Sequence, residues 1–138
     1  MRSMTRAVAA LVACATLAIA AYSNAAPGHI VRTHLLISFR VEETAQPGSF
    51  RVEILGRIRA SSGKCVRERR VKLFFEREGK RHLRDSGLSS QRGAIGLTGR
   101  AHSPPHRYIV KVTRKRIDTP RHHYTCTRAA KAFKPHSF

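Results

Sequence analysis

Apolar and polar residues alternate over several segments of the chain, which is the pattern of β-strands that bury one face. The alternation is cleanest over 50–59, where phenylalanine, valine and isoleucine share one parity and charged residues fill most of the other. It recurs over 35–41 and over 108–112. Within 66–77 the alternating apolar residues are at positions 71, 73 and 75. We therefore predict a strand in each of these four segments, with turns rich in glycine, serine and proline between them.

Weaker patterns account for most of the remaining chain. Isoleucine and leucine alternate with glycine over 94–99, which favours a short edge strand because interior glycines weaken strand pairing. We predict a final strand over 124–128 and loops over 85–93 and 114–123. Alanines over 127–133 would support a single helical turn. Six or seven short strands without convincing helical periodicity predict an all-β fold, either a sandwich or a small barrel.

The N-terminal segment has the order of a secretory signal peptide. Two arginines and no acid precede an apolar run over 7–21. This run of 15 residues is shorter than the roughly 20 helical residues that are needed to cross a hydrocarbon core. No second apolar stretch of this kind follows, so we predict a secreted mature chain without a transmembrane segment.

Small residues at Ser23 and Ala25 suit a signal peptidase, and we place the cut after Ala25. The prediction is then a signal peptide over 1–25 and one domain over 26–138, because the mature length suits a single core. The alternative is a lipoprotein, since the four residues that end at Cys14 also resemble a site of cleavage and cysteine acylation. The apolar run continues for seven residues past that cysteine, which favours simple secretion.

Two cysteines, Cys65 and Cys126, stay in the mature chain. Thiols are oxidised outside the cytoplasm, so we predict that the two form a disulfide. Closing a loop of about 60 residues would stabilise the fold by about 4 kcal/mol in the chain-entropy treatment. That is a large share of the net stability of a domain of this size.

The composition adds a strong positive charge to this picture. The formal charge is +19, from 27 lysines and arginines against 8 acids, and removal of the two arginines in the signal peptide leaves +17. Such a charge attracts anionic partners, among them wall polymers, phospholipid head groups, acidic proteins and nucleic acid. Arginine outnumbers lysine 20 to 7, a bias that the base composition of the coding genome would also produce.

Nine basic residues could gather into stripes that contact anions. The candidate anion-binding residues are Arg67, Arg69, Arg70, Lys72, Lys111, Arg114, Lys115, Arg116 and Arg121. Aromatic platforms for stacking nucleic-acid bases are scarce, because the chain has no tryptophan and most of its aromatic residues have the inward parity. Phe74 is the clear outward aromatic residue beside basic neighbours.

The sequence offers no catalytic constellation and no cofactor motif. Only two aspartates are present, the G-x-S-x-G motif is missing, and no pair of carboxylates suits glycoside hydrolysis. Among the eight histidines, two prolines separate His102 from His106, and His122 and His123 are adjacent. A metal site needs three or four converging ligands, so we predict solvated histidines, no metal, no cofactor and no enzyme activity.

Three segments resemble a known group of sandwich domains. They are 56–58 ahead of Cys65, 70–74, and 107–112 with its tyrosine. In this order they are similar to transthyretin-like or carboxypeptidase-regulatory-like domains, and to small exported bacterial proteins of unknown function. The resemblance covers about 50–128. It implies an antiparallel two-sheet sandwich of immunoglobulin-like or transthyretin-like type, with an inter-strand disulfide and no activity.

The chain departs from this group in two places. Two prolines, a histidine and an arginine over 104–107 replace the glycine that commonly precedes the tyrosine. The similar B-type repeats of bacterial collagen adhesins carry a lysine-to-asparagine isopeptide bond, and this bond is impossible here because Asn24, the only asparagine, leaves with the signal peptide. An adhesin role is therefore disfavoured.

Taken together, these features predict a secreted, non-catalytic protein with a binding or structural role, which is monomeric or weakly self-associating. We expect its basic surface to contact an anionic polymer of the cell envelope or an acidic protein. The alternative is an extracellular nucleic-acid-binding protein, because basic charge binds nucleic acid at low salt whether or not the binding is biological. The envelope partner is preferred since an exported domain meets it first.

Overall fold

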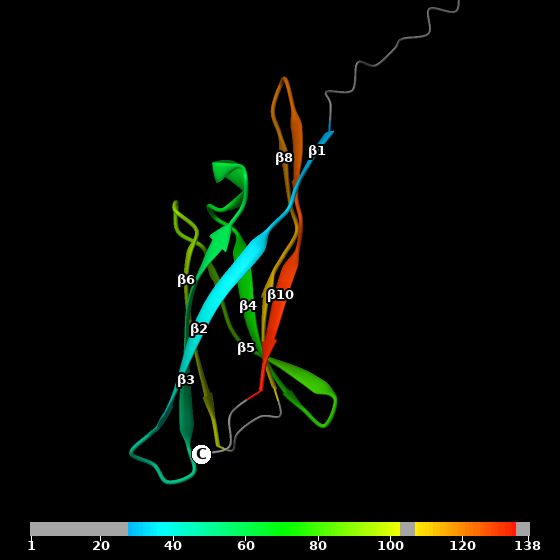
Figure 1. Cartoon of the computed structure of the whole chain (residues 1–138). Coiled ribbons are helices and arrows are strands. Elements are labelled where there is room, and N and C mark those ends of the chain that lie inside the picture. Colours follow the sequence, from blue (N-terminus) through cyan, green and yellow to red (C-terminus); the bar gives the residue numbers. More distant parts are fainter. Residues whose placement is uncertain (1–27, 103–106, 135–138) are drawn as a thin grey trace, which may run out of the picture.

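The computed structural model describes residues 28–102 and 107–134, which form ten strands and one short 3-10 helix (Figure 1). The elements in chain order are β1 (Gly28–Val31), β2 (His34–Glu43), β3 (Phe50–Arg59), η1 (Gly63–Cys65), β4 (Arg70–Arg77), β5 (Lys80–Leu88), β6 (Ala94–Ala101), β7 (Arg107–Val112), β8 (Lys115–Asp118), β9 (His123–Cys126) and β10 (Ala129–Phe133). The all-β prediction is confirmed, although the strands outnumber the six or seven expected.

Two antiparallel sheets face each other and form the sandwich that the sequence predicts. One sheet has the order β2-β3-β6 and the other has the order β10-β7-β4-β5. The core between them comes from the alternating residues of four strands, namely Val52, Ile54, Ile58, Val71, Leu73, Phe75, Ile95, Leu97, Ala101, Tyr108, Val110 and Val112. Each large apolar side chain buried here contributes about 1.5–3 kcal/mol to folding. Alternation in the sequence therefore identified the inward face correctly.

A third, smaller sheet of order β1-β9-β8 extends the molecule at one end of the sandwich (Figure 1). Strands β7 and β8 lead to a turn over 119–122, and β9 and β10 return alongside them, so the two sheets share one long hairpin. Pairing within this hairpin is interrupted at 113–114 and, opposite, at 127–128. Strand β1 joins β9 in parallel.

Three segments that the sequence placed outside strands are strands in the structure. Strand β5 occupies part of the loop predicted over 85–93, β8 part of the loop predicted over 114–123, and β10 replaces the helical turn over 127–133. All three lie at the edge of a sheet. Most of their side chains are exposed or only half buried, so the apolar alternation that marks a buried strand is missing from their sequences.

The strand predicted over 66–77 begins only at Arg70, and Cys65 lies in η1 rather than on the inward face of that strand. Glu68 explains the late start, because its φ of 51° is in the left-handed region, which strands do not use. Cys65 is nevertheless fully buried. The parity of the sequence places Cys65 on the same side as Val71, Leu73 and Phe75, and its burial agrees with that inward parity.

The N-terminal predictions fall outside the described residues. These are the signal peptide over 1–25, the cut after Ala25 and the lipoprotein alternative at Cys14, and all three stay predictions. Within 28–102 and 107–134, no helix has the length and apolar character that crossing a membrane requires.

Candidate anion-binding face

The predicted disulfide between Cys65 and Cys126 is present and fixes the base of the third sheet. The two Cα atoms lie 5.4 Å apart, and the cysteines are separated by 61 positions in the sequence. The bond joins η1 to the last residue of β9, and both cysteines are buried with Val31 in a second small core. It therefore ties the third sheet to the sandwich at the level where the long hairpin is interrupted.

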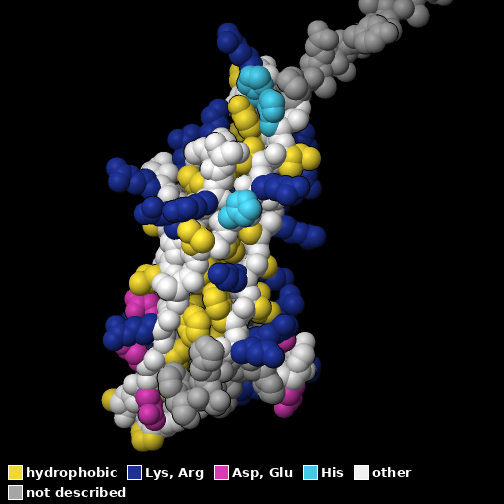
Figure 2. Space-filling view, viewed as in Figure 1, with side chains coloured by type: hydrophobic (Ala, Val, Ile, Leu, Met, Phe, Trp, Pro, Cys, Tyr) yellow, Lys and Arg dark blue, Asp and Glu magenta, His cyan; other side chains and the backbone are white. Residues whose placement is uncertain are grey.

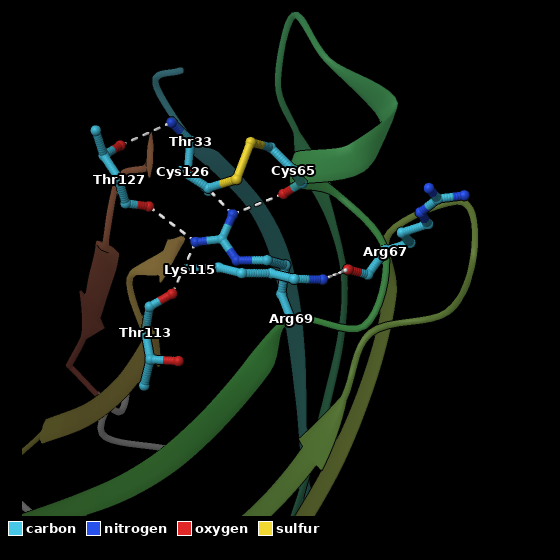
Figure 3. Close-up of a disulfide and its surroundings, with 8 residues drawn as sticks. All are labelled: Thr33, Cys65, Arg67, Arg69, Thr113, Lys115, Cys126 and Thr127. Atoms are coloured by element: carbon cyan, nitrogen blue, oxygen red, sulfur yellow. Dashed lines mark hydrogen bonds between the residues drawn. A yellow bond between two sulfur atoms is a disulfide. The ribbon is translucent and has the colours of Figure 1, made fainter. Parts of the chain in front are cut away.

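Arg69 lies beside the disulfide and is a fully buried side chain (Figure 3). Its Nη1 donates to the carbonyl oxygen of Cys65 at 2.6 Å and to Oγ1 of Thr33 at 3.0 Å. Its Nη2 donates to the carbonyl oxygens of Thr113 at 2.7 Å and Thr127 at 2.9 Å. The guanidinium therefore binds both strands of the long hairpin where they no longer pair with each other.

This geometry corrects the sequence prediction for Arg69. A side chain with no exposed surface cannot contact an external anion, so Arg69 is not part of an anion-binding surface. Burial lowers the pKa of Arg69, but an arginine stays protonated at neutral pH. Its charge is stabilised by carbonyl and hydroxyl oxygens and not by an acid. Because no acidic partner is involved, the burial of Arg69 could not be recognised from the pattern of charges in the sequence.

A cavity of about 600 Å³ lies at the hairpin interruption, beside β7 and β10. Its lining residues are Lys111, Val112, Thr113, Arg114, Arg128, Ala129 and Ala130. Three of them are cations and none is an acid. Arg128 was not among the predicted residues. It directly precedes β10, whose pairing with β7 was not recognised from the sequence.

Two further cations share the outer face of the four-stranded sheet with this cavity. Lys72 of β4 pairs directly with Lys111 of β7, and Arg70 lies two residues before Lys72, so all three have the same parity. The Nζ atom of Lys111 lies 5.6 Å from the centre of the Phe74 ring, a cation–π contact that holds the ammonium on this face. We define the basic face as Arg70, Lys72, Lys111, Arg114 and Arg128.

Farther along the same outer face, a carboxylate compensates the arginines. Glu76 pairs in register with Arg81 of β5 and Arg107 of β7, and its oxygens lie 3.2 Å and 2.7 Å from nitrogens of these two side chains. Desolvation opposes ionisation of Glu76, but the hydrogen bonds from Arg81 and Arg107 outweigh it and lower the pKa of the carboxyl. The cations at this end are therefore paired, whereas the basic face has no such carboxylate among its cross-strand neighbours on β4 and β7.

The remaining predicted residues lie away from the basic face. Lys115 donates to the carbonyl oxygen of Arg67 at 3.1 Å (Figure 3), and both line a separate cavity of about 440 Å³. Arg116 lies 3.4 Å from Asp118 on the same strand, and Arg121 lies in the turn between β8 and β9. The structure thus brings together four of the nine predicted residues and separates the others.

The distribution of charge on the visible face follows the same division. Figure 2 shows lysine and arginine side chains along the whole length of the molecule, while the acidic side chains in view gather at the end away from the third sheet. On this face the basic side chains are therefore spread broadly, whereas the acidic ones lie at one end.

The histidines do not converge on a metal centre in the described part of the chain. Nε2 of His29 lies 3.4 Å from Nδ1 of His122, and Nδ1 of His123 lies 2.5 Å from a carboxylate oxygen of Asp118. No group of three histidines, cysteines or acids comes together in 28–102 or 107–134. His106 lies outside these ranges, and the absence of a metal stays a prediction.

Comparison of the chain with protein-family models, with curated proteins and with solved structures finds no match. The likeness to transthyretin-like domains therefore stays a prediction, and the function must be argued from the geometry alone.

Proposed function

We propose that this chain is a non-catalytic, exported binding protein whose basic face holds an anionic polymer of the cell envelope. The observation that carries the proposal is the cavity beside Lys111, Arg114 and Arg128, whose lining contains three cations and no acid. Arginine presents a planar fork of donors that matches carboxylate and phosphate groups. The basic face therefore offers the chemistry that an acidic polymer requires.

The strand register adds an energetic reason. Lys72 and Lys111 lie directly opposite each other on neighbouring strands, and like charges in this position destabilise a sheet by about 0.2–1 kcal/mol. A bound carboxylate or phosphate between them would turn this repulsion into attraction. Binding of an anion should therefore stabilise the folded protein as well as fill the cavity.

The surface suits a flexible acidic polymer better than nucleic acid. Base stacking needs free aromatic faces, and the outward Phe74 is half buried and already covered by the ammonium of Lys111. Contacts with the polymer would then be mainly ionic. Nucleic acid stays the second outcome of the test, because its phosphates would also bind the same cations.

The test compares a triple variant of the basic face, K111A/R114A/R128A, with the wild-type protein. Retention on immobilised anionic wall polymer and on single-stranded DNA is measured between low and physiological salt. Exposed ion pairs contribute about 0.2–1 kcal/mol each, so the triple variant should bind the wall polymer roughly tenfold more weakly. A charge-matched control is K80A/R59A/R92A, which removes three exposed cations elsewhere.

The control should retain most of the affinity, since its cations lie outside the basic face. Equal losses in the two triple variants would show that binding follows net charge alone and would contradict the proposal. Retention of DNA but not wall polymer at physiological salt would replace the proposed partner with nucleic acid.

A further inference from the structure

A third cavity is lined by residues of strands from both sheets and by the loop between β2 and β3. It measures about 390 Å³ and is lined by Gln46, Ser49, Arg77, Arg84, Arg100, Ala101 and His102. The three arginines come from three different strands, β4, β5 and β6. No acid is among the lining residues, so the cavity concentrates positive charge next to the end of the core.

Arg84 reaches this cavity because strand β5 carries a bulge. Pairing with β4 shifts register between Leu73 and Phe74, whose partners are Asp85 and Leu83, so Arg84 is the extra residue. A bulge changes the direction in which the side chain of its extra residue points. Here the guanidinium carbon of Arg84 lies 5.3 Å from the centre of the Phe75 ring, which belongs to the core.

Gly99 of β6 makes room for this arrangement. A Cβ atom at this position would lie 2.8 Å from Cζ of Phe75 and 3.4 Å from Cβ of Arg84. Any larger residue would push the ring and the arginine stem away from the strand that carries Arg100. The bulge and the glycine are independent features of the chain, and both favour the same position of Arg84.

We propose that this cavity binds a phosphate group. Guanidinium groups form paired, charge-assisted hydrogen bonds with phosphate oxygens. The guanidinium groups of Arg84 and Arg100 come from strands of the two different sheets. Donors on separate strands suit a tetrahedral anion, which accepts hydrogen bonds from several directions, better than a planar carboxylate. The ligand is either free inorganic phosphate or a phosphate group on an envelope polymer. This inference does not rest on the basic face or on its proposed function.

The experiment titrates inorganic phosphate into ¹⁵N-labelled, disulfide-bonded protein at low ionic strength and follows the side-chain Nε–H signals of Arg84 and Arg100 by NMR. Saturable shifts are expected in the wild type, with roughly tenfold weaker binding in R84Q and in R100Q because each loses a charged donor. R92Q removes an exposed arginine outside the cavity and should bind phosphate like the wild type. The amide spectrum would reveal a folding defect in R84Q or R100Q. If one of these two variants does not fold, the other still provides the test.

Shifts that rise without saturation, or wild-type affinity in both cavity variants, would overturn the proposal. A parallel titration with a short poly(glycerol phosphate) separates the two sources of the ligand. If the affinity per phosphate group is higher for poly(glycerol phosphate) than for inorganic phosphate, the natural ligand is a polymer. If the two affinities are equal, the ligand is the free ion. The basic-face variant K111A/R114A/R128A should bind inorganic phosphate here normally, so failure of one proposal is distinguishable from failure of the other.

Discussion

Replacing the buried Arg69 with methionine should remove a large part of the stability of the domain. The guanidinium makes four hydrogen bonds, three of them to backbone carbonyl oxygens. Methionine has a similar length but no donor, so it leaves these acceptors unpaired in the interior at about 1–3 kcal/mol each. Part of this cost is offset because the buried charge and its desolvation penalty also disappear. We expect a net loss of about 3–4 kcal/mol, close to the contribution of the disulfide.

Urea unfolding of the oxidised proteins, followed by far-ultraviolet circular dichroism, measures this loss. R70M is the matched control, because Arg70 is the next residue and its side chain is exposed, so its free energy of unfolding should change by at most about 0.5 kcal/mol. R69K should fall between the wild type and R69M. A lysine keeps the charge but has a single nitrogen, which cannot reach all four acceptors at once.

Two results would refute this reasoning. A loss below about 1 kcal/mol in R69M would mean that the carbonyl oxygens find other partners. A gain in stability would mean that the desolvation of the charge exceeds what its hydrogen bonds return, as replacement of buried ionic groups by apolar ones sometimes shows.

Three further predictions concern the stability of the fold. The double variant C65S/C126S should lose about 4 kcal/mol of unfolding free energy in the same urea assay, because the closed loop is released. G56A should lose about 1–3 kcal/mol, since its Cβ would lie 2.5 Å from a backbone carbonyl oxygen of β2; G96A, where nothing lies within 4 Å, should be unchanged or gain up to about 1 kcal/mol. The pKa of Glu76 is lowered in the folded protein. The ionised carboxylate therefore stabilises the fold fully above the ordinary glutamate pKa, and this stabilisation is lost as the pH falls through the pKa of Glu76 in the folded state. The stability difference between wild type and E76Q should therefore shrink from pH 7 to acidic pH, and a constant difference would contradict the proposed ion pairs.

The sandwich core could be predicted from the sequence because burial of one face imposes a period of two. Strand β3 was predicted with its observed bounds, and the buried residues of β4, β6 and β7 were placed on the correct side. Strands β5, β8 and β10 could not be found in this way, because their side chains are exposed or only half buried. At an edge, the backbone hydrogen bonds with a neighbour define the strand, and these bonds leave no pattern in side chains that face the solvent.

The candidate site was predictable only in part, for a similar reason. Lys72 and Lys111 were named from their charge, but their direct pairing depends on the register between β4 and β7. The position of Arg128 in the basic face depends on the pairing of β10 with β7, and β10 was not detected from the sequence. The burial of Arg69 depends on carbonyl oxygens whose partners are set by the whole fold, and no count of charges along the chain distinguishes it from its exposed neighbour Arg70.

The burial of Arg69 also explains how this fold can interrupt a hairpin and use the opening. An unpaired break in two strands would leave buried carbonyl oxygens without donors, which is costly. Arg69 supplies donors to one carbonyl on each strand of the break, Thr113 and Thr127. The next residues along each strand, Arg114 and Arg128, line the cavity beside the basic face. One buried arginine thus stabilises the interruption that positions two exposed ones, so the stability of the fold and the shape of the proposed binding face depend on the same break in the hairpin.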